Sequence, residues 1–70
     1  MEGYIGVYSG VPIYKVYKKD YKPMKDTYIV LLDSNDVVLN GMIVGYWKNG
    51  LENEIIPLPK PVIFPFKPND

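Results

Sequence analysis

The 70-residue sequence contains no cysteine and no histidine. Without cysteine no disulfide can form, and without either residue the preferred ligands of a structural zinc site are missing. The same absence removes the usual general base and the usual thiol nucleophile of enzymes. One carboxylate pair, Glu52 and Glu54, lies at strand spacing, but this pattern is typical of an exposed strand. We therefore expect no enzyme, no catalytic residue, no metal and no cofactor.

Alanine, glutamine and arginine are also missing. Alanine and glutamine commonly fill the surfaces of helices, so their absence argues against helix. Tyrosine, valine and isoleucine are abundant instead, and these residues favour strands. A chain of this length builds one domain, and with neither disulfide nor metal it gains stability most readily from a neighbouring subunit or a docking partner. The sequence therefore predicts one small all-β domain.

Long apolar runs are missing too. No stretch reaches the roughly 18 residues that a membrane-spanning helix needs, so we expect no membrane partner. The segment after Met1 lacks a basic region followed by an apolar run, so we expect no secretion signal. These features predict a cytoplasmic protein, which for a viral protein means the host cytoplasm or the virion.

The first half of the chain alternates in the manner of strands. Residues 3–8 and 11–18 alternate on either side of Ser9-Gly10, which predicts a hairpin. Residues 18–26 carry charge and turn residues without periodicity, which predicts a loop. The apolar run at residues 27–32 predicts a central strand buried on both faces, followed by a turn at residues 33–36. The aspartate, serine and asparagine of that turn favour local hydrogen bonds over a calcium site.

Two interpretations remain open around Asn40-Gly41. Residues 37–47 form either a tight hairpin at this dipeptide or one long strand with a glycine bulge. We favour the bulge, because a hairpin leaves three-residue strands, which are shorter than usual. Residues 48–50 then predict a turn that leads into a strand at 51–56.

Five of the seven prolines lie between Pro57 and Pro68. Prolines at this spacing cannot occupy a central strand, yet the segment is too apolar for a free linker. We therefore divide the chain into a β-domain, residues 1–56, and an extended Pro-rich arm, residues 57–70, packed on the domain or on a partner. The predicted fold is a small antiparallel meander of five or six strands that forms a barrel or a sandwich, with this C-terminal arm.

The arm and an aromatic pair point to a binding surface. Tyr46 and Trp47 lie on opposite faces of a strand, so one should be buried and the other exposed as an interface anchor. The residues expected to bind a partner are Tyr46, Trp47, Pro59, Phe64 and Phe66. Lysines outnumber acids in residues 1–32 and acids outnumber lysines in residues 33–54, a division that suits self-association. The first hypothesis is therefore a non-enzymatic structural or accessory protein that binds a larger protein assembly or forms a homo-oligomer.

A second hypothesis follows from lysines that alternate with tyrosines. These residues are Lys15, Tyr17, Lys18, Lys19, Tyr21, Lys22 and Lys25. Positive charge beside stacking rings is typical of proteins that bind single-stranded nucleic acid. The net charge of zero favours a solvated loop instead, because nucleic-acid binders are usually basic overall. A third hypothesis is a small inhibitor of a host enzyme. None of the three involves a small-molecule substrate.

One part of the chain resembles a known family. The segments Ile5 to Tyr14, Lys22-Pro23-Met24 and Tyr28 to Asp33 resemble a β-segment near the carboxyl end of tailed-phage major capsid proteins. There a strand, a Gly-X-Pro-hydrophobic turn, a short loop with proline and an apolar strand ending in Asp recur. The resemblance covers fewer than half of the residues. It implies an accessory or structural protein of a phage or virus.

Overall fold

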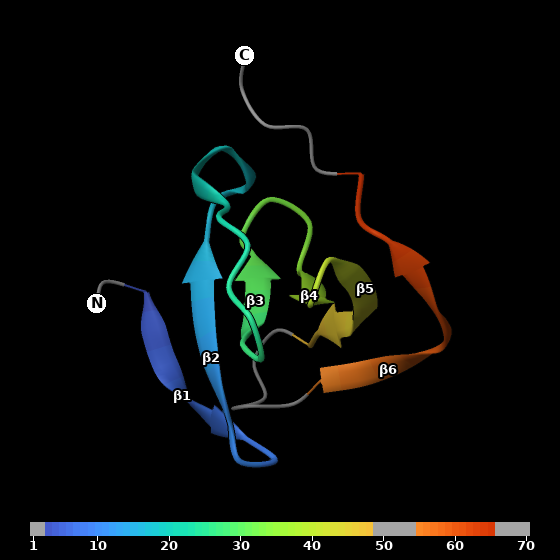
Figure 1. Cartoon of the computed structure of the whole chain (residues 1–70), viewed down its shortest axis with the longest axis horizontal. Helices are drawn as coiled ribbons and strands as arrows, with labels where there is room; N and C mark the ends of the chain where they lie inside the picture. Colours follow the sequence, from blue (N-terminus) through green and yellow to red (C-terminus); the bar gives the residue numbers. More distant parts are fainter. Residues whose placement is uncertain (1–2, 49–54, 66–70) are drawn as a thin grey trace.

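The computed structural model of the protein describes residues 3–48 and 55–65. These residues form a single six-stranded sheet, whose strands lie side by side in chain order, with one short 3-10 turn (Figure 1). The elements are β1 (Tyr4–Tyr8), β2 (Val11–Val16), η1 (Lys18–Asp20), β3 (Tyr28–Leu31), β4 (Asp36–Leu39), β5 (Met42–Trp47) and β6 (Ile55–Ile63). The predicted all-β class is confirmed. In the described part of the chain, no helix has the length and apolar character needed to cross a membrane.

The predicted barrel or sandwich is wrong, because the described strands form one sheet and this sheet is open. β1 pairs only with β2 and β6 pairs only with β5 within the described residues, so the two end strands do not meet. Closing a barrel requires the first and last strands to exchange backbone hydrogen bonds. In this sheet β6 ends the row instead, and its prolines cannot donate backbone hydrogen bonds to a further strand.

The hairpin of β1 and β2 is confirmed. Both turn residues have positive backbone φ, 51° at Ser9 and 79° at Gly10, which is the type I′ pattern of two-residue hairpins. The register skips one residue between Tyr4 and Gly6, so Ile5 forms a bulge in β1.

The antiparallel meander is wrong at one place, because β2 and β3 are parallel. Residues 17–27 carry the chain back along one face of the sheet before β3 begins (Figure 1). Parallel neighbours need a crossover of about a dozen residues, which is close to the length of this segment. The loop predicted from residues 18–26 is therefore confirmed as a loop, and it is the crossover of a mixed sheet. We call residues 17–27 the crossover loop.

The bulge favoured at Asn40-Gly41 is wrong, because this dipeptide is the turn of a hairpin. Its φ values are 49° and 81°, again the type I′ pattern. The hairpin is possible because β4 is longer than expected. It begins at Asp36, inside the turn predicted at residues 33–36, and so has four residues. A bulge does occur in β5, but at Val44, which is the extra residue between the Ile43 and Gly45 pairings with β4.

β6 takes in the first half of the predicted arm. Residues 57–63 belong to this edge strand, and the pairing with β5 is irregular around its prolines. Pro65 is the last described residue. The predicted turn at residues 48–50, the strand start at 51–54 and the arm beyond Pro65 lie wholly or partly outside the described residues.

Each face of the sheet carries its own apolar cluster. The first-face cluster takes one buried side chain from each of five successive strands, namely Ile13, Val30, Val37, Trp47 and Ile55. The second-face cluster combines three sheet residues with one residue of the crossover loop and one residue just after β6, namely Tyr21, Ile29, Leu31, Val38 and Phe64. The central strand β3 contributes to both, and residues 29–31 are buried as predicted.

Candidate functional site

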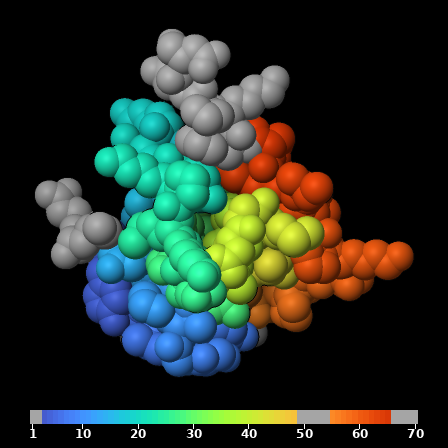
Figure 2. Space-filling model, in the orientation of Figure 1, coloured from blue at the N-terminus to red at the C-terminus, as the bar shows by residue number. Residues whose placement is uncertain are grey.

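The crossover loop is held to the sheet at both ends. At its start, the Lys18 backbone N–H donates to Asp33 Oδ1 at 2.7 Å. At its end, the Asp26 backbone N–H donates to Asn40 Oδ1 at 2.9 Å, and Asn40 Nδ2 donates to Asp26 Oδ1 at 3.4 Å. We call the Asp26–Asn40 pair the latch. The space-filling view shows the loop lying across the molecule beside the β4–β5 hairpin (Figure 2).

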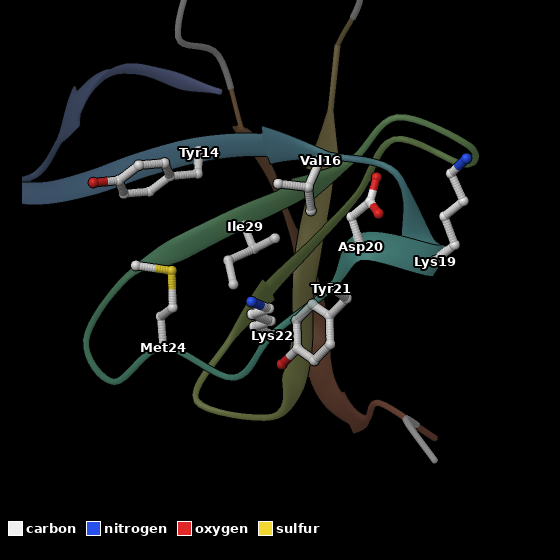
Figure 3. A pocket seen from close by; sticks show the side chains of 8 residues that line it. All are labelled: Tyr14, Val16, Lys19, Asp20, Tyr21, Lys22, Met24 and Ile29. Carbon is white, nitrogen blue, oxygen red and sulfur yellow. The ribbon is translucent and has the colours of Figure 1, made fainter. Parts of the chain in front are cut away.

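A cleft of about 430 Å³ opens between this loop and the second face of the sheet. Tyr14 and Val16 of β2 and Ile29 of β3 reach into it from the sheet (Figure 3). Met24 and Tyr21 face them from the loop. The floor of the cleft is therefore apolar. The parallel pairing of β2 with β3 places two of its lining side chains, Tyr14 and Ile29, next to each other.

Tyr21 is the innermost residue of the loop and is only 5% exposed. Its ring packs edge-to-face on Phe64, with the ring centres 4.9 Å apart. Burial raises the pKa of the Tyr21 phenol above its ordinary value of 10.0, because the charged form would lose hydration. Tyr21 thus anchors the loop as a neutral core residue.

Charge is confined to the rim of the cleft. Lys19, Asp20 and Lys22 line it, two lysines against one aspartate, so the rim carries a net charge of +1. Figure 3 shows the Lys19 side chain directed away from the apolar side chains. Lys22 is therefore the lysine best placed to meet a group that enters the cleft.

The other predicted lysines lie elsewhere. Lys15 is on the first face, where its Nζ sits 5.1 Å from the centre of the Trp47 ring. The Lys18 Nζ lies 5.9 Å from the centre of the Phe64 ring. Lys25 lines a separate hollow beside the β4–β5 turn. The lysine and tyrosine set predicted as one surface is thus divided, and Tyr17 is its one tyrosine that is more than half exposed.

The residues predicted to bind a partner are divided as well. Tyr46 is 45% exposed and Trp47 only 7%, which confirms that one ring is buried and the other exposed. Phe64 is also 7% exposed, because it packs in the second-face cluster. Trp47 and Phe64 are therefore core residues in this fold, while Tyr46 and Pro59 remain on the surface. Phe66 lies outside the described residues.

The acidic candidates offer no assembled site in the described part of the chain. Glu52 and Glu54 fall outside it. In the turn that follows β3, Asp33 accepts the Lys18 N–H, and the Ser34 hydroxyl donates to Asp36 Oδ2 at 3.0 Å. Asn35 takes a positive φ of 64°, as asparagine often does in turns. The bond between Ser34 and Asp36 stabilises this turn locally, whereas Asp33 joins the turn to the start of the crossover loop.

Four residues of the cleft are absent from the sequence-based candidates, namely Tyr14, Val16, Met24 and Ile29. They alternate or cluster as ordinary core residues would, and no chemical motif distinguishes them. Only the parallel placement of β2 beside β3, with the loop folded over both, brings them together. The unusual length of the predicted loop was the one available signal.

Comparison of the chain with known protein families, with curated proteins and with solved structures gives no match. The features of the chain that bear on its function are therefore the cleft and the surfaces of the sheet.

Proposed function

We propose that this chain is a non-enzymatic interaction domain that attaches to a larger protein assembly by taking an apolar side chain of that assembly into the cleft. The observation that carries the proposal is the cleft itself, about 430 Å³ of space over an apolar floor with charge only at the rim. Moving an apolar side chain from water onto such a floor is favourable, by about 25 cal/mol per Å² of apolar surface removed from water.

The rim adds a preference for charge. With two lysines against one aspartate, it attracts a segment that carries carboxylates beside its apolar residue. Because these groups are exposed, each ion pair contributes at most about 1 kcal/mol. The apolar side chain therefore supplies most of the affinity, and the lysines supply selectivity.

A nucleic acid fits the cleft less well. Stacking needs an exposed ring face beside positive charge. Tyr21 is buried, and Tyr14 packs edge-to-face against Tyr4 with the ring centres 5.4 Å apart. Lys15 lies on the opposite face of the sheet. Together with a net charge of zero, this distribution favours a protein partner.

The larger assembly in this proposal is a phage or virus particle, in line with the capsid-like segments of the sequence. The chain then acts as an accessory protein attached to the particle. An inhibitor of a host enzyme would use the same cleft but would form a one-to-one complex, which the mass of the isolated complex distinguishes.

The test is a titration of the ¹⁵N-labelled protein with capped tripeptides, followed by NMR. Acetyl-Asp-Phe-Asp-amide should shift the amide signals of Val16, Met24 and Ile29. Acetyl-Asp-Ser-Asp-amide should not shift them, because it lacks the apolar side chain. Lys22→Ser should weaken binding of the first peptide up to about fivefold, the equivalent of about 1 kcal/mol. Lys25→Ser removes the same charge outside the cleft and should leave binding unchanged.

Two results would contradict the proposal. The first is a phenylalanine peptide that shifts no signal in the cleft. The second is an oligothymidylate that shifts the same signals more strongly than the peptide, with an affinity that falls steeply as salt is added. The second result would establish the nucleic-acid hypothesis instead.

A further inference from the structure

The two edges of the sheet differ in their ability to accept another strand. β6 contains Pro57, Pro59 and Pro61, which have no N–H, and it also carries the exposed Lys60. Prolines and lysines are the usual protection of an edge strand. β1, Tyr-Ile-Gly-Val-Tyr, contains neither proline nor charge. Within the described residues no strand pairs with its outer side.

The outward-facing backbone groups of β1 follow from its pairing with β2. Val7 lies opposite Pro12, which has no N–H. In a two-residue hairpin the pair next to the turn is hydrogen-bonded and the following pair is not, so the N–H and C=O of Val7 face outward. Lys15 N–H donates to the Gly3 carbonyl at 2.7 Å, so Gly3 faces β2 and, by alternation, Tyr4 faces outward.

The bulge at Ile5 makes the spacing of these groups unusual. Outward-facing residues of a regular antiparallel strand are two apart, whereas Tyr4 and Val7 are three apart. A regular strand, whose bonding residues are two apart, can therefore form backbone hydrogen bonds with only one of these two residues. A second copy of β1 running antiparallel has the same three-residue spacing. Tyr4 of each copy then lies opposite Val7 of the other copy, so both outward-facing positions find a partner.

The side chains support the same match. The bulge shifts the alternation of side chains along β1, so Tyr4 and Val7 lie on the same face of the sheet. Their cross-strand neighbours in β2 are Tyr14 and Pro12, respectively. Tyr4 is 50% exposed and Val7 is 51% exposed. An aromatic residue opposite a β-branched residue is a favourable cross-strand pair. With no charge on β1, two copies meet no like-charge repulsion there.

We propose that β1 is a self-association edge, through which two copies of the chain pair antiparallel and join their sheets into one. The interface is isologous, with Tyr4 of each copy against Val7 of the other. A strand of five residues is a small contact for a protein interface, so we expect a weak, reversible dimer that forms only at high protein concentration. This inference is independent of the cleft.

The experiment compares two substitutions of the same kind on the two edges. Sedimentation velocity of the full chain from low micromolar to millimolar concentration should show reversible dimer formation. Val7→Lys should abolish the dimer by placing like charges at the pairing edge. Val62→Lys, at a residue of β6 that is 54% exposed, should leave it unchanged. Circular dichroism checks that each variant keeps the strand content of the parent chain.

Amide hydrogen exchange of the unsubstituted chain gives a second reading. The Val7 N–H should exchange rapidly at low concentration and become protected as the dimer forms, while the amides that already bond within the sheet change little. A chain that stays monomeric over the whole concentration range, with fast exchange at Val7, overturns the proposal. The β1 edge would then be available for pairing with a strand of another protein. Equal loss of dimer in Val7→Lys and Val62→Lys also overturns it, because the contact is then not specific to β1.

Discussion

The two faces of the sheet bury apolar side chains in different ways. Within the described residues, the first-face cluster takes one buried residue from each of β2 to β6, so its buried side chains all come from strands of the sheet. The second face depends on Tyr21 from the crossover loop and on Phe64 beyond β6 to cover Ile29 and its neighbours. Because a loop covers a sheet less completely than another layer would, a cleft remains on that face. The difference shows how an open sheet leaves a cleft where its own strands do not complete the core.

The largest expected effect tests the difference between the faces directly. Ile13 is 0% exposed in the first-face cluster, and Ile29 is 3% exposed at the floor of the cleft. Replacing a buried isoleucine by alanine usually costs about 2–5 kcal/mol, and the cost grows with the cavity that remains. We expect Ile13→Ala to lose stability near the upper end of this range, because the cavity it leaves is closed. We expect Ile29→Ala to lose stability near the lower end, because the cavity it leaves joins the cleft.

Urea unfolding of the two variants, followed by circular dichroism, measures both free energies. Each variant is the control of the other, because the residue type and the strand environment match. An equal loss of stability, or a larger loss for Ile29→Ala, would show that the second face is packed as tightly as the first.

An intermediate effect is expected at the latch. Asn40→Gly keeps the positive φ that the hairpin turn requires but removes both side-chain hydrogen bonds to Asp26. We expect the free energy of unfolding to fall by about 1 kcal/mol, the usual net contribution of such bonds. Asn35→Gly is the matched control, because Asn35 also has a positive φ but carries no part of the latch.

Amide exchange of Met24 and Lys25 should also speed up in Asn40→Gly and not in Asn35→Gly, because the latch holds this end of the crossover loop. Equal stability of the two variants, with unchanged exchange at Met24, would show that the loop is held by its apolar contacts alone.

The smallest expected effect is a pH dependence at Tyr21. Burial raises the pKa of its phenol above 10.0 in the folded state, while the unfolded chain releases the proton near 10.0. The folded state therefore holds the proton more tightly, and this contribution to stability is present in full below pH 10. It is lost as the pH rises from 10 through the raised pKa of the folded state.

Thermal unfolding between neutral pH and pH 11 measures this loss. Tyr21→Phe should reduce the fall in melting temperature above pH 10, whereas Tyr17→Phe, at a residue that is 53% exposed, should not. The same slope in both variants would show that Tyr21 keeps its ordinary pKa in the folded state.

Local signals in the sequence were sufficient for several elements. Ser9-Gly10 between two alternating runs predicted the first hairpin, and the apolar run at residues 27–32 predicted the buried central strand. Asn40-Gly41 carried a correct hairpin signal as well. Strand length favoured a bulge there instead, but β4 begins one residue earlier than expected, at Asp36, and so the hairpin has strands of sufficient length.

The tertiary structure alone decided the remaining features. Strand alternation identifies which residues share a face, but it is the same for parallel and antiparallel neighbours, so the direction of β3 beside β2 had to come from the path of the crossover loop. The burial of Tyr21 followed from that path, and so did the cleft, whose walls come from two strands and a loop that are separate in sequence. What the sequence determined by itself was strand composition, the hairpin turn at Ser9-Gly10 and the proline-rich character of β6, because each of these depends on the local preferences of a few adjacent residues.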